Sequence, residues 1–367
     1  MPNIIDYLKW RGDITFEQVK LNEVDNLILS QLAFVDFSGI VPSDPAAPPV
    51  TVKQAAMQFF FENNIKKNSR PGLIISQQTY KMFRLMAQSK RFADLQLSAY
   101  VNEIDLKQEK QFSALTIRLK EKLSYISIRG TDDTIVGWKE DFNLSFLDEI
   151  PSQRRVVEYV NSICAVQPGN FYVGGHSKGG HLALYSLVKC APEYKNRIVA
   201  GFSNDGPGFS KDFTKLPEYK AAESKFHIYM PQNSIVGMFF ENSERRRVVK
   251  SSHIGVFQHD GMSWEVMGSG FVRVNKLGND AINTVLLNER IHALPLEARK
   301  HFVDVLFGML ESTGVKTLSE LNAKGLKSMI AMIKTFNDLD KKERDLMLLL
   351  IAELLDLRLS EAPIEVS

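Results

Sequence analysis

The sequence predicts an α/β fold with a mainly parallel sheet and helices on both of its faces. Short apolar strands alternate with amphipathic helices through the middle of the chain, which is typical of parallel sheets. A glycine-rich turn near residue 177 joins one such strand directly to a helix. With 367 residues and 44% hydrophobic composition, the chain can bury one large core rather than two equal ones.

Residues 1–110 are predicted to be a helical segment packed on that core. Asn22 can cap a helix whose first turn holds Glu23 and Asp25, where the helix dipole favours acidic side chains. Two further helical stretches are expected near residues 52–63 and 76–87.

Residues 111–275 are predicted to form the α/β core. A period-two strand at 112–119 and a second strand at 123–128 flank a short charged turn, which indicates an antiparallel hairpin. Strands and helices then alternate. The predicted elements are a helical face over 156–164, a strand at 171–173, a helix at 179–189, and strands at 198–203 and 226–230.

Residues 276–367 are predicted to be a helical extension with helices at 280–292, 296–311, 318–336 and 341–357. The most apolar stretch, 346–355, is too short to span a bilayer and contains Glu353, so no transmembrane segment is expected. It begins with the apolar run 346–351. We expect this stretch to pack on the main domain. The alternatives are a cover over the substrate mouth, a partner site or a peripheral membrane contact.

Composition excludes several functional classes. Lys and Arg number 45 against 43 Asp and Glu, for a net charge of +2 without a block of like charge, so no nucleic-acid partner is expected. The histidines are not spaced as metal ligands, and no cofactor is indicated. Two cysteines, Cys164 and Cys190, lie among apolar residues, and the N-terminus lacks a signal-peptide pattern. We therefore expect a cytoplasmic protein with reduced thiols.

The strongest chemical motif is Gly175-His176-Ser177-Lys178-Gly179, which lies between an apolar strand and an apolar helix. A catalytic serine must project from a sharp strand-to-helix turn, and Gly175 and Gly179 remove side chains that would clash there. This arrangement is the nucleophile elbow of the α/β-hydrolase fold, with Ser177 as nucleophile. The alternative is a glycine-rich turn that only lets the helix pack on the strand.

A serine nucleophile needs a histidine base and an acid, which follow it in the chain order Ser, acid, His in this fold. His259 lies in a loop after the last clear strand and is the expected base, with His253 as its rival. Asp205 directly follows the strand at 198–203 and is the expected acid. The alternative for Asp205 is a turn residue that hydrogen-bonds its own backbone.

Two oxyanion-hole donors are expected. One is the backbone N–H of Lys178, directly after the nucleophile. The other is the N–H of Thr131, with its hydroxyl as a further donor, in the loop after the strand at 123–128. The alternative for Thr131 is a simple polar turn.

The segment Arg129-Gly130-Thr131, followed by Trp138 and Asp141, resembles a conserved segment of class 3 lipases, as does the elbow. Over about residues 1–270 the chain is similar to a bacterial Mbeg-like family within that clan. The resemblance implies an α/β-hydrolase fold with Ser177 as nucleophile, His259 as base and Thr131 at the oxyanion hole.

Two departures from the lipase pattern stand out. Class 3 lipases usually carry their acid after the strand at 226–230, where this sequence has Asn233 and Ser234. Either Asp205 replaces that acid or the acid is missing. Lipases also commonly have an apolar residue where this chain has Lys178, and a charge there would suit a polar or anionic acyl substrate.

The expected function is hydrolysis of carboxylic esters, of small molecules or lipids, through a Ser-His-Asp triad and an acyl-enzyme. The alternative is a catalytically lapsed α/β-hydrolase-fold protein with a binding or regulatory role.

Overall fold

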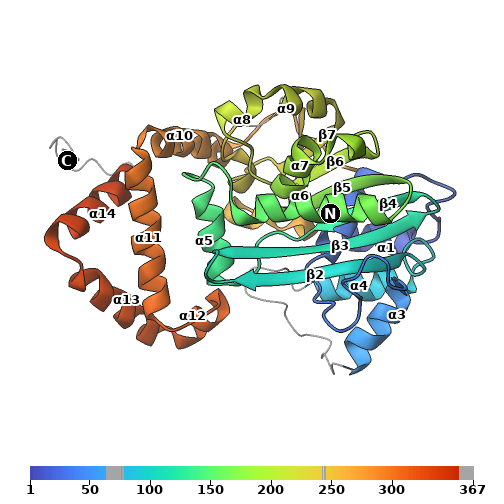
Figure 1. Cartoon of the computed structure of the whole chain (residues 1–367), viewed down its shortest axis with the longest axis horizontal. Helices are drawn as coiled ribbons and strands as arrows, with labels where there is room; N and C mark the ends of the chain where they lie inside the picture. The colour runs from blue at the N-terminus through green and yellow to red at the C-terminus, as the bar shows by residue number, and fades with distance from the viewer. Residues whose placement is uncertain (63–75, 77, 242, 244, 355–367) are drawn as a thin grey trace.

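The computed structural model of the chain describes residues 1–62, 76, 78–241, 243 and 245–354. Within these residues the fold is α/β, and one mixed sheet of eight strands forms its centre (Figure 1). The sheet strands are β1 Val50–Thr51, β2 Gln96–Asp105, β3 Lys110–Lys120, β4 Leu123–Ile128, β5 Asn170–His176, β6 Ile198–Asn204, β7 Phe226–Pro231 and β8 Arg246–Val249. A small separate hairpin pairs β9 Val266–Met267 with β10 Gly270–Phe271.

The strands lie in the sheet in the same order as in the chain. Strands β1 to β4 pair antiparallel, and β4 to β8 pair parallel. The expected hairpin of residues 112–119 and 123–128 is confirmed as β3 and β4. The carboxyl ends of β4 to β7 therefore meet at one edge, where ligands bind in open α/β sheets.

Strand β2 is not among the elements predicted from the sequence. Its pairing with β3 shifts register between Ser98 and Val101, where Ala99 has a positive φ of 54°. This bulge breaks the period-two alternation on which a strand prediction depends. Residues 1–110 thus supply two strands of the sheet as well as helices, and the division of the chain at 110 and 275 remains a prediction.

Helices cover both faces of the sheet. Helices α1 Ile4–Arg11, α2 Glu23–Leu32, α3 Val52–Met57 and α4 Thr79–Gln88 share one apolar core with alternate strand residues such as Leu115, Ile117 and Tyr125. On the other face, α6 Pro151–Val166, α7 Lys178–Lys189 and α9 Pro217–Ala222 pack on Ile126, Ile128 and their neighbours. Helix α8 Lys211–Lys215 precedes α9.

Asn22 caps α2 as predicted, by accepting hydrogen bonds from the N–H groups of Val24 and Asp25. The stretch expected at 52–63 is α3 followed by a π-helical turn at Gln58–Glu62, and residue 63 lies outside the described residues. The stretch expected at 76–87 is α4, and residue 77 is likewise not described.

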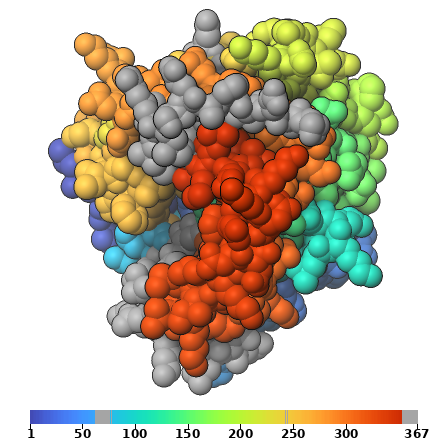
Figure 2. All heavy atoms as spheres, turned by 90° about the vertical axis from the view of Figure 1, so that its left-hand side faces the viewer, coloured from blue at the N-terminus to red at the C-terminus, as the bar shows by residue number. Residues whose placement is uncertain are grey.

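A lobe of five helices follows the core, at the left of Figure 1: α10 Asn279–Ala293, α11 Leu296–Ser312, α12 Leu318–Lys324, α13 Leu326–Asp338 and α14 Lys341–Leu354. The single helix expected at 318–336 is two helices, because Gly325 takes a φ of 46° between them. The predicted end of the last helix, residue 357, lies outside the described residues. Seen from the lobe's side, these helices form the centre of the surface (Figure 2).

The lobe contacts the core through α5 Ile135–Asn143 and the loop before it. Ile135 packs with Val303, Phe307 and Val315 in a small buried cluster. Ile135 N donates to Lys316 O at 2.9 Å, and Leu318 N donates to Asp133 O at 2.9 Å. The lobe is therefore fastened to the loop that leaves the carboxyl end of β4.

The apolar stretch 346–351 packs with one face only. Met347 and Leu350 are buried, whereas Leu348 and Ile351 are exposed. No helix of the described chain combines the length and the apolar character that crossing a bilayer requires.

Candidate active site

Ser177 is the single residue between the end of β5 and the start of α7, and it has φ 59° and ψ −135°. A non-glycine residue reaches this region only when its surroundings enforce it. Ser177 N donates to Asn204 O at 3.0 Å, and Gly180 N donates to Ser177 O at 2.9 Å. The first bond ties the strand-to-helix turn to the neighbouring strand β6, and the second lies within the turn itself.

Gly175 and Gly179 lie where the turn crosses the end of β4. A Cβ on Gly179 would fall far inside contact distance of Ile128 O, and a Cβ on Gly175 would overlap the backbone of Gly179. The backbone can therefore turn this sharply only without side chains at these two positions.

Ser177 is partly exposed. A Cβ on Gly130 would lie 3.0 Å from Ser177 Cβ, so the loop after β4 runs directly beside the serine. Within the described part of the chain, Ser177 Oγ makes no hydrogen bond. Catalytic hydrogen bonds are often long before substrate is bound.

Asp205 and His259 are brought together. Asp205 follows β6 with a φ of 54°, and its backbone N–H donates to Tyr229 O at 2.7 Å. His259 Nδ1 lies 2.7 Å from the buried Asp205 Oδ2. Because an ionised carboxylate only accepts, Nδ1 carries a proton, which leaves Nε2 as the ring nitrogen that can accept one.

Ser234 completes the surroundings of Asp205. Its Oγ donates to Asp205 Oδ1 at 2.5 Å and accepts from Gly237 N at 2.9 Å. It lies in the loop after β7, where class 3 lipases usually place their acid. The sequence did not predict this role of Ser234, because it showed only that no carboxylate stands at this position.

His176 supports the backbone of His259. Its Nε2 lies 2.7 Å from His259 O, and since a carbonyl only accepts, Nε2 carries the proton. The two rings lie 4.5 Å apart between centroids. Burial, reinforced by the neighbouring His259, lowers the pKa of His176 to about 3. His176 therefore stays neutral. Because it directly precedes Ser177, its bond to His259 O ties the loop that carries His259 to the turn.

The other histidines lie elsewhere. His253, the rival base, is exposed, and its Nδ1 contacts Phe257 O at 3.2 Å. His227 stacks on Phe202 at 5.0 Å. His181 is buried in α7, where its Nδ1 donates to Gly208 O at 2.9 Å.

Thr131 and Lys178 provide two unpaired backbone donors beside the elbow. Neither N–H donates to an acceptor in the described residues. The Thr131 hydroxyl, expected as a further donor, instead donates to Asp141 Oδ2 at 2.5 Å. Burial raises the pKa of Asp141 to about 6, against the opposing effects of Lys178 and Thr131.

The side chain of Lys178 points into the protein, whereas binding an anionic acyl group would require it to face the substrate. It is only 1% exposed. Its Nζ donates to Glu140 Oε2 at 2.9 Å and to Gln111 O and Oε1 at 3.1 and 3.0 Å. The premise of the expected preference for a polar or anionic acyl substrate is therefore wrong, because the Lys178 ammonium is buried and paired inside the protein.

A family model described as Mbeg1-like matches residues 86–308, which is more than half of the chain. The chain belongs to the Mbeg1-like family. The matched range differs from the expected 1–270, but it contains all seven predicted site residues. Neither the curated proteins nor the solved structures contain a match to this chain.

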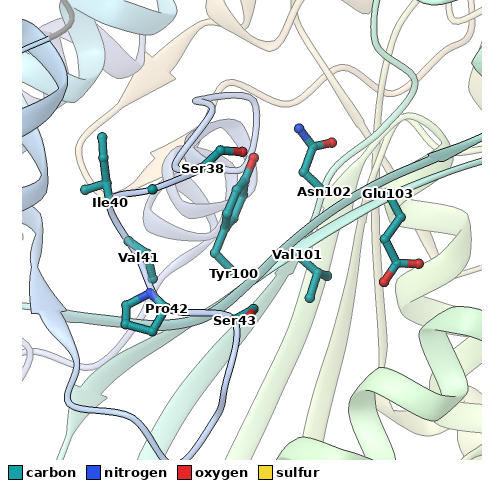
Figure 3. Close-up of a pocket in the computed structure, with 10 residues that line it drawn as sticks. Ser38, Ile40, Val41, Pro42, Ser43, Tyr100, Val101, Asn102 and Glu103 are labelled. Carbon is teal, nitrogen blue, oxygen red and sulfur yellow. The ribbon is translucent and has the colours of Figure 1, made fainter.

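One hollow in this Mbeg1-like chain lies away from these residues. It has a volume of about 550 Å³ and lies between the loop 38–43 and β2, lined by residues such as Ser38, Tyr100 and Asn102 (Figure 3). None of the predicted site residues lines it. The described residues also contain no group of three or more His, Cys, Asp or Glu side chains that could hold a metal ion.

Proposed function

We propose that this protein is a serine hydrolase of the α/β-hydrolase fold, related to class 3 lipases, that cleaves carboxylic esters. The observation that carries the proposal is the 2.7 Å hydrogen bond between Asp205 Oδ2 and His259 Nδ1 at the sheet edge where Ser177 occupies a strained turn. A buried carboxylate that fixes an imidazole tautomer beside a serine elbow is the arrangement that activates a hydroxyl.

The proposed reaction has two steps. His259 Nε2 removes the proton from Ser177 Oγ while Oγ attacks the ester carbonyl carbon. The negative charge on the carbonyl oxygen is stabilised by the N–H groups of Lys178 and Thr131. The imidazolium then protonates the departing alcohol, which leaves an acyl-enzyme. Water, deprotonated by His259, attacks the acyl carbon and releases the acid and free Ser177.

The direct test is labelling with a fluorophosphonate probe together with hydrolysis of p-nitrophenyl esters of increasing chain length. Wild type should be labelled and should turn over esters, whereas Ser177→Ala should do neither. His259→Ala should lower kcat by about 10⁴-fold or more. Ser186→Ala, a buried serine of the same helix α7, is the matched control and should retain activity.

Labelling that persists in Ser177→Ala would reject Ser177 as the nucleophile. A folded wild type without labelling or turnover would reject the hydrolase proposal itself.

One observation favours the second candidate, a lapsed hydrolase fold that binds or regulates. Among the described residues, Ser177 Oγ has no hydrogen-bonded base. The missing carboxylate after β7 gives this candidate little support, because Ser234 in that loop donates to Asp205 Oδ1 at 2.5 Å. The labelling experiment separates the two candidates.

A further inference from the structure

Two adjacent carboxylates of α5 hold the two residues that provide the candidate oxyanion-hole donors. Glu140 Oε2 accepts from Lys178 Nζ at 2.9 Å. Asp141 Oδ2 accepts from Thr131 Oγ1 at 2.5 Å. One short helix thus contacts both sides of the site beside Ser177.

The Lys178 ammonium is fully satisfied inside the protein. Its three hydrogen bonds go to Gln111 O, Gln111 Oε1 and Glu140 Oε2, and an ammonium has three protons to donate. Burial alone would lower the pKa of Lys178, but the carboxylates of Glu140 and Asp141 raise it. Lys178 therefore stays charged and fixed.

Glu140 is equally well bound. It is completely buried, and its oxygens also accept from Gln111 N at 3.0 Å, Ser152 N at 2.9 Å and Ser152 Oγ at 2.8 Å. Buried ion pairs of this kind often add little stability over apolar residues of similar size. Stability alone therefore does not explain why a lysine follows the nucleophile.

We propose that the buried Lys178–Glu140 ion pair is a positioning device for the oxyanion hole, which ties the first residue of α7 to α5 and so fixes the Lys178 N–H opposite Thr131. This inference rests on the proposed hydrolase function. By anchoring its own residue, the Lys178 side chain fixes the position of the Lys178 backbone N–H. A displacement of about 1 Å at a reacting centre can lower the rate about 10²-fold.

The experiment measures kcat, KM and inhibition by a trifluoromethyl ketone, which forms a tetrahedral adduct that uses the oxyanion hole. Lys178→Met and Glu140→Gln should each lower kcat about ten- to hundredfold, below the 10²–10³ of losing a donor outright. KM should change less than about twofold, because the interaction strengthens only in the transition state. Ketone affinity should fall in parallel with kcat.

The double variant Lys178→Met/Glu140→Gln removes both charges of the Lys178–Glu140 pair together and guards against misfolding of the single variants. It should fold with near wild-type stability and still show the low kcat. The matched control is Arg91→Met, which breaks the buried ion pair with Asp25 on the other face of the sheet. It should lower the unfolding temperature but leave kcat and ketone affinity unchanged in the folded protein.

The outcomes separate the two proposals. A wild type that is not labelled at Ser177 overturns both. A labelled wild type with kcat and ketone affinity unchanged in the folded double variant overturns the positioning role alone. Equal losses in the Arg91→Met control would also overturn it, since they would show a general effect of stability.

Discussion

Asp205 is the residue on which the geometry of the candidate triad depends. Its backbone conformation at φ 54° and its two side-chain bonds aim Oδ2 at His259. Asp205→Asn should lower kcat by about 10⁴-fold, because an amide can favour the wrong imidazole tautomer. The measurement is p-nitrophenyl ester hydrolysis, with circular dichroism to verify the fold, and wild-type turnover in this variant would exclude Asp205 as the acid.

Replacing Ser234 should lower kcat measurably, but less than replacing Asp205. Ser234→Ala removes one hydrogen bond to a carboxylate, and such bonds contribute about 1.5–3 kcal/mol. We expect kcat to fall about 10- to 150-fold if this whole contribution is lost in the transition state. Ser186→Ala again serves as the control, and equal kcat in both variants would show that the Ser234 bond does not support Asp205.

His181 gives the fold a pH dependence. Burial lowers the pKa of His181 from 6.5 to about 4, against the backbone carbonyls of Pro207 and Gly208. Between these values the unfolded chain binds a proton that the folded chain does not, so stability falls as pH falls from about 6.5 to 4. For one proton the slope is at most about 1.4 kcal/mol per pH unit.

His181→Gln should reduce that slope in urea unfolding measured across this pH range, although His176 contributes in the same direction. His253→Gln, at an exposed position, should leave the slope unchanged. An identical slope in His181→Gln and wild type would mean that His181 is not neutral in the fold.

At the scale of single elements, the sequence predicted those with a clear period or a sharp boundary. The hairpin of β3 and β4 and the sharp turn at Ser177 before helix α7 were found, because alternation and glycine spacing are local signals. Strand β2 was missed because the bulge at Ala99 interrupts its alternation. The break at Gly325 was missed because a single glycine does not by itself end a helix.

The same distinction holds within the candidate site. Ser177 and its glycines carry a motif in consecutive residues, whereas the Ser234–Asp205 bond and the Lys178–Glu140 pair join residues far apart in the chain. No periodicity records such pairings. Side-chain direction also decides the role of Lys178, and a sequence does not show whether a lysine points to solvent or into the protein.

The two helices that contain Gly179 and Gly308 respond oppositely to the same substitution. Gly179→Ala forces a Cβ onto Ile128 O and should destabilise the fold by about 3 kcal/mol. Gly308, inside α11, has nothing within 4 Å of the position of a Cβ, and Gly308→Ala should stabilise by up to about 1 kcal/mol. Thermal unfolding measures both, and a stable Gly179→Ala would contradict the close crossing of the elbow over β4.

At the scale of the whole molecule, we expect the helical lobe to unfold together with the core, because the two share a buried apolar cluster. Phe307 is 1% exposed and packs against Phe142 of α5, with ring centroids 5.5 Å apart. Phe307→Ala should destabilise by about 3–5 kcal/mol, whereas Leu326→Ala, at a side chain that is 65% exposed, should change little. Urea unfolding of the full chain measures both variants. A Phe307→Ala variant as stable as Leu326→Ala would show that the lobe does not unfold together with the core.

The tie between the start of the chain and the hairpin β9–β10 has a consequence for biosynthesis. Asn3 Nδ2 donates to Met262 O, 259 residues away, and Val266 N donates to Pro2 O. At about 5–20 residues per second, a ribosome needs roughly 13 to 52 s to supply that partner after the first residues are made. Strands can join the sheet one after another as they emerge, but α1 and α2 must wait for their last contacts. During that interval their apolar side chains are available to chaperones, and a nascent chain shorter than about 266 residues has no finished N-terminal layer.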